Sequence, residues 1–130
     1  MPETIVARFV VTGWDPQELP ALDADGWVEA VVMRKRFTEG LVGESVAHFV
    51  SSGDEEGGRG YLAVERVTGT LDDGRSGSVT VHHGALDSPD DPSAFGHLIP
   101  GSGTGDFADW RGSARIRHDD RGASLELSLE

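Results

Sequence analysis

Hydrophobic and polar residues alternate along most of this chain with a period of two, which is the pattern of β-strands. The alternation is clearest over residues 123–130, where alanine and leucine alternate with serine and glutamate. Residues 112–117 alternate in the same way, and the Asp-Asp-Arg-Gly run at 119–122 is typical of a tight turn. The end of the chain is therefore predicted to form a β-hairpin.

The same pattern predicts eight strands along the chain. They are Ile5–Thr12, Trp27–Thr38, Leu41–Ser51, Gly60–Leu71, Ser76–Ala85, Ala94–Ile99, Gly112–Arg117 and Ala123–Glu130. Most connections are short and rich in Gly, Asp and Pro, which suits antiparallel neighbours. Only Asp15–Gly26 is long enough to form a separate loop, and its two prolines argue against a helix.

Eight consecutive antiparallel strands hide their edges when they close into a barrel, whose interior holds side chains or one small ligand. We therefore predict an all-β fold with little or no helix, built as a single domain over residues 1–130. A two-sheet sandwich is the alternative. Glycine supplies 18 of the 130 residues, about twice its usual share, which favours turns and strands over helices.

The charge balance restricts the partners. Eleven Lys and Arg against 23 Asp and Glu give a net charge of −12, which repels nucleic acid and anionic lipid. The first residues lack the features of a signal peptide, and no run of 18 apolar residues occurs. We expect a cytoplasmic protein that binds neither nucleic acid nor membranes. The absence of cysteine excludes disulfides, thiolate metal sites and a cysteine nucleophile.

Several segments resemble a known family. They are Phe9-x-Val11-x-x-Trp14-Asp15, Phe37-x-x-Gly40-x-x-Gly43, the run Tyr61–Leu71 containing Glu-Arg-Val-Thr-Gly-Thr-Leu, Gly74–Ser78, His82-His83-Gly84 and Pro100–Phe107 with its Gly-Ser-Gly-Thr-Gly. Together they resemble a bacterial family of small uncharacterised proteins, classified as a domain of unknown function, over nearly the whole chain. Two apolar residues, Val79 and Phe107, depart from the family pattern of Phe and Leu.

The resemblance implies the allene oxide cyclase-like, or calycin-like, β-barrel, with no agreed reaction, and we expect no cofactor. It also implies a possible homo-oligomer, as in the plant cyclases. Barrels of this shape include enzymes that fold and cyclise reactive hydrophobic intermediates, an analogy that rests on fold alone.

Two charged residues are predicted to face the barrel interior. Lys35, the only lysine, shares a strand face with Met33 and Phe37, and Glu65 shares one with Tyr61 and Val67. A carboxylate in such a low-dielectric cavity needs a partner, which Lys35 supplies. The pair is either an acid or base in an apolar pocket or a structural ion pair. The opposite register, with Arg66 facing inward, stays open.

Of two adjacent histidines on the fifth strand, only one can face inward, and Val79, Val81 and His83 share a face. His83 is the candidate proton carrier. The alternative is a histidine bonded to backbone at the strand end. A metal site needs further ligands on that face, and since His48 and His97 are candidates only by count, no metal is predicted.

The glycine-rich segment Gly101–Gly105 lacks the spacing of a dinucleotide-binding loop, so we predict a strained turn between the sixth and seventh strands. Trp14, Trp27 and Trp110 are expected to pack, to plug a barrel mouth, or to form a lid or an oligomer contact. Phe9, Trp14, Met33, Phe37 and Val67 are the candidate ligand-binding residues.

Three hypotheses follow from the residues. In the first, the barrel binds a small, largely apolar or amphipathic molecule and assists an isomerisation or cyclisation without a cofactor. Glu65 and His83 would then handle protons, Lys35 would set the charge and Tyr61 would orient an oxygen. In the second, the same residues only orient a bound molecule. In the third, the chain is an oligomeric structural protein with a filled interior. The sequence leaves open whether the chain is an enzyme.

Overall fold

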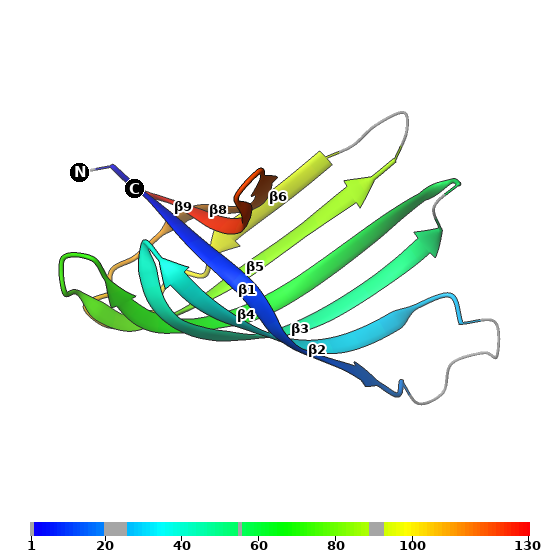
Figure 1. The fold of residues 1–130 in the computed structure, drawn as a ribbon, viewed down its shortest axis with the longest axis horizontal. Helices are drawn as coiled ribbons and strands as arrows, with labels where there is room; N and C mark the ends of the chain where they lie inside the picture. Colours follow the sequence, from blue (N-terminus) through cyan, green and yellow to red (C-terminus); the bar gives the residue numbers. More distant parts are fainter. Residues whose placement is uncertain (1, 20–25, 55, 89–92) are drawn as a thin grey trace.

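The computed structural model describes residues 2–19, 26–54, 56–88 and 93–130. Over these residues the chain is all-β, without helix, and its nine strands form one antiparallel sheet (Figure 1). The strands are β1 (Glu3–Gln17), β2 (Glu29–Glu39), β3 (Leu41–Asp54), β4 (Gly58–Leu71), β5 (Ser76–Asp87), β6 (Ser93–Leu98), β7 (Thr104–Gly105), β8 (Gly112–Asp119) and β9 (Gly122–Leu129). Nothing in this part of the chain is a helix able to cross a membrane.

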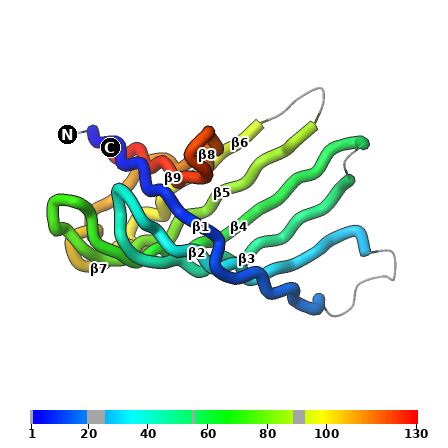
Figure 2. The backbone as a smooth tube through the Cα atoms, viewed as in Figure 1, coloured from blue at the N-terminus to red at the C-terminus, as the bar shows by residue number. Residues whose placement is uncertain are grey.

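The strand pairings run in a ring. The order is β4-β3-β2-β1-β9-β8-β6-β5, and β5 pairs again with β4, while the short β7 pairs with β5. The first and last strands lie side by side, so both termini lie at one end of the molecule (Figure 2). We call this the terminal end and the opposite one the far end. At the far end β2 to β5 extend beyond β8 and β9 (Figure 1).

Most predicted strands are confirmed, with boundaries that differ by a few residues, and the predicted hairpin is the β8–β9 pair. The predicted loop Asp15–Gly26 begins too early, because β1 continues to Gln17 and Pro16 lies opposite Val31. This part of β1 pairs with β2 alone, so the missing N–H of proline can face away from the ladder. Residues 20–25 of that loop lie outside the described residues.

The glycine-rich segment is a turn, as predicted, with positive φ at Gly101 and Gly105. It also holds the one strand that the alternation missed, because β7 spans only two residues and pairs with Gly77 and Ser78 of β5. Just beyond it, Phe107 stacks on Trp110 with 3.9 Å between ring centroids, and both side chains are buried. Trp110 thus packs in the core, whereas Trp14 and Trp27 are exposed.

The apolar core fills the inside of the ring toward the terminal end. Its cluster includes Ile5, Ala7, Phe9, Phe37, Leu41, Val67, Leu71, Val79, Val81, Leu98, Phe107, Trp110, Ala114, Leu125, Leu127 and Leu129. These are inward-facing residues of consecutive strands, as the period-two pattern requires. Burial of this set provides the main stabilisation of the fold.

Three glycines lie side by side in the same region, where Gly43 pairs with Gly69 and Gly69 pairs with Gly77. A Cβ atom on Gly69 would lie 2.5 Å from Leu41 Cδ2 and 2.6 Å from the backbone oxygen of Val42. No side chain fits here unless the backbone shifts. The glycines therefore allow β3, β4 and β5 to approach closely as the sheet curves.

We predict that Gly69→Ala lowers the free energy of unfolding by about 1–3 kcal/mol, because the added methyl group overpacks the core. Urea unfolding measures the change. The control is Gly60→Ala in the same strand, where a Cβ atom would meet no atom closer than 3.6 Å. An equal loss of stability in both variants would contradict the role given to Gly69.

Candidate functional site

The site is built around Glu65, in the middle of β4. Its side chain faces the inside of the ring and is 0% exposed, whereas Arg66 points outward. The Arg66 guanidinium donates to the Thr80 hydroxyl at 2.9 Å and to the Ser102 backbone oxygen at 2.7 Å. Glu65, not Arg66, is therefore the inward-facing charge.

Three side chains from three other strands contact the Glu65 carboxylate. Lys35 Nζ of β2 lies 3.0 Å from Oε1, and the Ser45 hydroxyl of β3 donates to Oε2 at 2.6 Å. His83 Nε2 of β5 lies 2.8 Å from Oε1. Four consecutive strands thus each contribute one polar side chain to a single buried cluster.

The strand register brings these residues together. Lys35 lies directly opposite Ser45, Glu65 lies opposite Ala47, and His83 lies opposite Ala63. The polar side chains therefore meet diagonally, and the alanines beside them leave room for the contacts. All of them lie on the far-end side of the apolar core.

The cluster extends to Tyr61, whose hydroxyl lies 2.9 Å from His83 Nδ1. Since Nε2 faces a carboxylate, the ring proton belongs on Nε2, which donates to Glu65. Nδ1 then accepts the hydrogen bond from the Tyr61 hydroxyl. The result is a continuous chain from Lys35 through Glu65 and His83 to Tyr61, which we call the polar chain.

The electrostatics favour an ionised Glu65. Burial raises the pKa of this carboxyl, but the hydrogen bond from His83, the charge of Lys35 and the Ser45 hydroxyl outweigh it and lower the pKa from 4.5 to about 2. Burial, followed by the negative charge of Glu65, raises the pKa of the Tyr61 hydroxyl. At neutral pH the chain thus joins a carboxylate to a protonated phenol.

Lys35 is also buried, and its ammonium group lies 4.3 Å from the centroid of the Phe9 ring. The aromatic face adds a favourable cation–π contact to the ion pair. Among the described residues, every buried side-chain nitrogen and oxygen has a hydrogen-bond partner. Each buried nitrogen and oxygen atom of the polar chain therefore has at least one hydrogen-bond partner within the protein.

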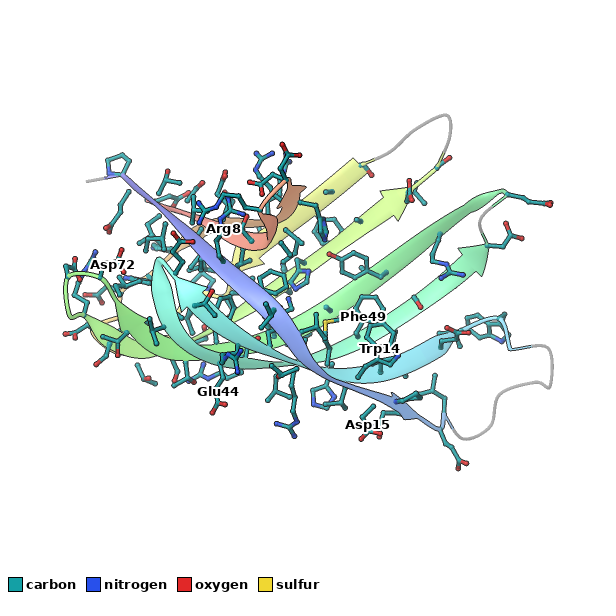
Figure 3. All side chains as sticks on the ribbon, viewed as in Figure 1. Arg8, Trp14, Asp15, Glu44, Phe49 and Asp72 are labelled. Atoms are coloured by element: carbon teal, nitrogen blue, oxygen red, sulfur yellow. The ribbon has the colours of Figure 1, made fainter. Side chains whose placement is uncertain are left out.

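An aromatic surface continues from Tyr61 toward the far end. Tyr61 stacks on Phe49 with 4.8 Å between ring centroids, and Phe49 lies 6.0 Å from Trp14. Figure 3 shows Trp14 and Phe49 close together. Trp14 is 57% exposed, and Phe49 and Tyr61 are half-buried. We call these three residues the aromatic shelf, an apolar surface open to solvent beside a hydroxyl group.

The candidate ligand-binding residues separate into two groups. Trp14 belongs to the shelf, and half-buried Met33 lies opposite it on β2. Phe9, Phe37 and Val67, in contrast, are packed in the apolar core. A ligand that contacts these three residues would have to displace the core that fills this half of the interior.

Sequence reasoning missed Ser45 and Phe49. Ser45 is a polar residue among inward-facing apolar and small residues of β3, so the period-two pattern was the signal that could have found it. Its specific partner depends on a diagonal contact between the neighbouring strands β3 and β4, which one sequence does not reveal. Phe49 lies on the same face of β3 by the same alternation, which was also the signal that could have found it.

The described residues contain no group of three or more His, Cys, Asp or Glu side chains placed to hold a metal ion. His82 and His97 face outward and contact each other, with Nε2 and Nδ1 2.9 Å apart. His48 is on the outward face as well. None of these three is part of the polar chain.

Comparison with known proteins gives a family and a fold. The profile of DUF3224, a protein family of unknown function, matches residues 5–130. The chain belongs to the DUF3224 family. Its structure is similar to the crystal structure of a DUF3224 protein of unknown function from Shewanella oneidensis MR-1, with a TM-score of 0.85 and 23% sequence identity. That match covers 100% of this chain and 97% of the other. No curated protein matches.

We predict that Glu65→Gln lowers the free energy of unfolding by about 3–5 kcal/mol at neutral pH, because the buried Lys35 ammonium loses its counter-charge. The lowered pKa of Glu65 adds a pH dependence. Stabilisation by the carboxylate is complete above the ordinary value of 4.5 and is lost as the pH falls toward 2. The difference between wild type and variant should therefore shrink over this range.

Urea unfolding at a series of pH values tests this prediction. Replacing both charges in Glu65→Gln/Lys35→Met should recover most of the lost stability, since no unpaired charge remains. Glu126→Gln is the surface control, because Glu126 pairs with the exposed Arg117 at 3.1 Å and should change stability by less than about 1 kcal/mol. A Glu65→Gln variant as stable as this control would refute the buried ion pair.

Proposed function

We propose that the chain binds a small, largely apolar molecule on the aromatic shelf and assists its isomerisation or cyclisation by proton transfer through Tyr61. The observation that carries the proposal is the polar chain, which connects a buried carboxylate to a half-buried phenol beside an apolar surface. We interpret the ring of strands as an eight-stranded barrel of the allene oxide cyclase-like type, whose far end admits the ligand.

Burial assigns different tasks to the four polar residues. Glu65 and Lys35 are enclosed by protein, so neither touches a ligand on the shelf. Tyr61 is the half-buried end of the chain and is the residue proposed to touch the reacting atoms. Glu65 acts through His83 as a positioning residue, holding the imidazole with its proton on Nε2, while Lys35 keeps the carboxylate ionised.

The proposed proton transfer balances within the site. The Tyr61 oxygen accepts a proton from an activated carbon of the substrate while its own proton moves to His83 Nδ1, forming an imidazolium that Glu65 stabilises. Return of the two protons in reverse order, to a different carbon, completes an isomerisation. No electrons leave or enter the site, so no redox partner is required.

Binding without turnover is the second candidate function. It is favoured because every buried polar atom of the polar chain has a partner within the protein, and such a cluster is stable as a purely structural element. In that case the shelf would recognise an apolar surface and Tyr61 would only orient an oxygen of the ligand.

We predict that the purified protein retains a small apolar compound from a metabolite extract and that mass spectrometry detects its conversion to an isomer. Tyr61→Phe keeps the stacked ring but removes the hydroxyl. It should slow conversion by about 10²–10⁴-fold, while the Kd rises by less than about tenfold.

Phe49→Ala is the complementary variant, and it should weaken binding more than it changes the rate of the bound compound. Val42→Ser, an outward-facing position remote from the shelf, is the control for both measurements. Retention of a compound that is recovered unchanged would favour the binding function over catalysis. Failure to retain any compound, or unchanged turnover in Tyr61→Phe, would overturn the proposal.

A further inference from the structure

Apolar side chains cover the outward face of β3 to β6 toward the far end. They are Val50, Leu62, Val64, Leu86 and Phe95, each between 38% and 56% exposed. The register places Val50 opposite Leu62, and Phe95 reaches the same row across Gly84. We call these five residues the outer patch. Contiguous exposed apolar surface of this kind marks an interaction site.

The outer patch borders a hollow of about 530 Å³, whose lining includes Val50, Leu62, Val64 and Phe95 and also Phe49 and His83 at the strand positions between them. No Lys, Arg, Asp or Glu is among the described residues that line it. Charged residues make up 26% of the whole chain, so this face is an uncharged area in a strongly acidic protein. Depletion of charge at the centre is typical of protein–protein interfaces.

Opposite charges flank the outer patch along the strands. Arg34, Arg36 and Arg66 lie outward on the side of the terminal end, accompanied by one carboxylate, Glu44. At the far end, Asp54 and Glu56 lie beyond the patch, accompanied by one arginine, Arg59. In a chain of net charge −12, this basic border complements an acidic surface on a partner. The opposite border of the same face is such an acidic surface, so a second copy of the chain can supply it.

The strand register determines which symmetry brings these opposite charges together in a contact between two copies of the chain. Along β3, Val46 lies opposite Arg34 and Arg66, and both Val46 and Asp54 are four residues from Val50. Consider a two-fold axis that lies in the interface along the Val50–Leu62 row, perpendicular to the strands. Rotation about this axis reverses the strand direction, so Arg34 and Arg66 of one copy lie over Asp54 of the other.

The size of the face agrees. The four strands β3 to β6, about 4.8 Å apart, over about ten residues of 3.4 Å rise, span roughly 650 Å², which lies within the range of about 600–1,000 Å² that each partner contributes to a standard interface. We propose that the chain forms a homodimer through the outer patch, with the strands of the two copies antiparallel across the two-fold axis.

Cross-linking tests this arrangement, since the chain has no cysteine. Leu62→Cys places a thiol on the proposed axis. Since packed sheets lie about 10 Å apart, beyond the reach of a disulfide, a short bismaleimide linker should convert most of the protein to a cross-linked dimer. Val42→Cys is the matched control, because Val42 is also outward-facing and 61% exposed but lies outside the patch. Equal cross-linking of the two variants, or none in Leu62→Cys, would overturn the proposal.

Analytical ultracentrifugation of the wild-type chain, which contains no cysteine, measures the dimer Kd directly. Substitutions of Arg34 and Asp54 test the orientation of the two copies. Arg34→Glu should raise the dimer Kd about tenfold by placing like charges together, and the added change Asp54→Arg should restore it. A wild-type chain that stays monomeric at high micromolar concentration contradicts the dimer. A monomer that instead binds neutral lipid vesicles would assign the patch to a lipid surface.

Discussion

The ionised carboxylate of Glu65 is the constraint on which the rest of the interior depends. A charge in the protein interior is tolerated only when counter-charge and hydrogen bonds replace the lost water. Here β2, β3 and β5 each supply one such group, Lys35, Ser45 and His83, so one side chain of β4 connects three other strands of the sheet. Loss of that charge would leave Lys35 unpaired in the same low-dielectric region.

The ring of strands divides the interior into two parts with different tasks. Toward the terminal end, the apolar core and the glycine row provide close packing and curvature. Toward the far end, the polar chain leads outward from the core to Tyr61 and the aromatic shelf. Buried charge on a rigid scaffold, with one half-exposed proton donor at its end, is the arrangement that the proposed proton transfer requires. The outward face serves association in our account.

Much of the fold and of the polar chain could be predicted from the sequence, because the alternation with a period of two determines both where the strands lie and which residues face inward. The period of two located the strands and placed Lys35, Glu65 and His83 on inward faces, and the need of a buried carboxylate for a partner joined Glu65 to Lys35. The rule does not reveal how far the core extends, and the candidate ligand-binding residues Phe9, Phe37 and Val67 are packed within it. Nor does it reveal diagonal contacts such as that of Ser45, or a bulged strand that continues through Pro16.

The central claim is that Glu65 is ionised inside the protein and holds His83 with its proton on Nε2. Carbon-13 NMR of the Glu65 carboxyl group, recorded against pH on the folded protein, tests it most directly. The account predicts a carboxylate signal that persists well below pH 4.5, the ordinary pKa of this group, since the pKa of Glu65 is lowered to about 2. A carboxyl group that takes up its proton near or above that ordinary value, while the fold is intact, would contradict the account.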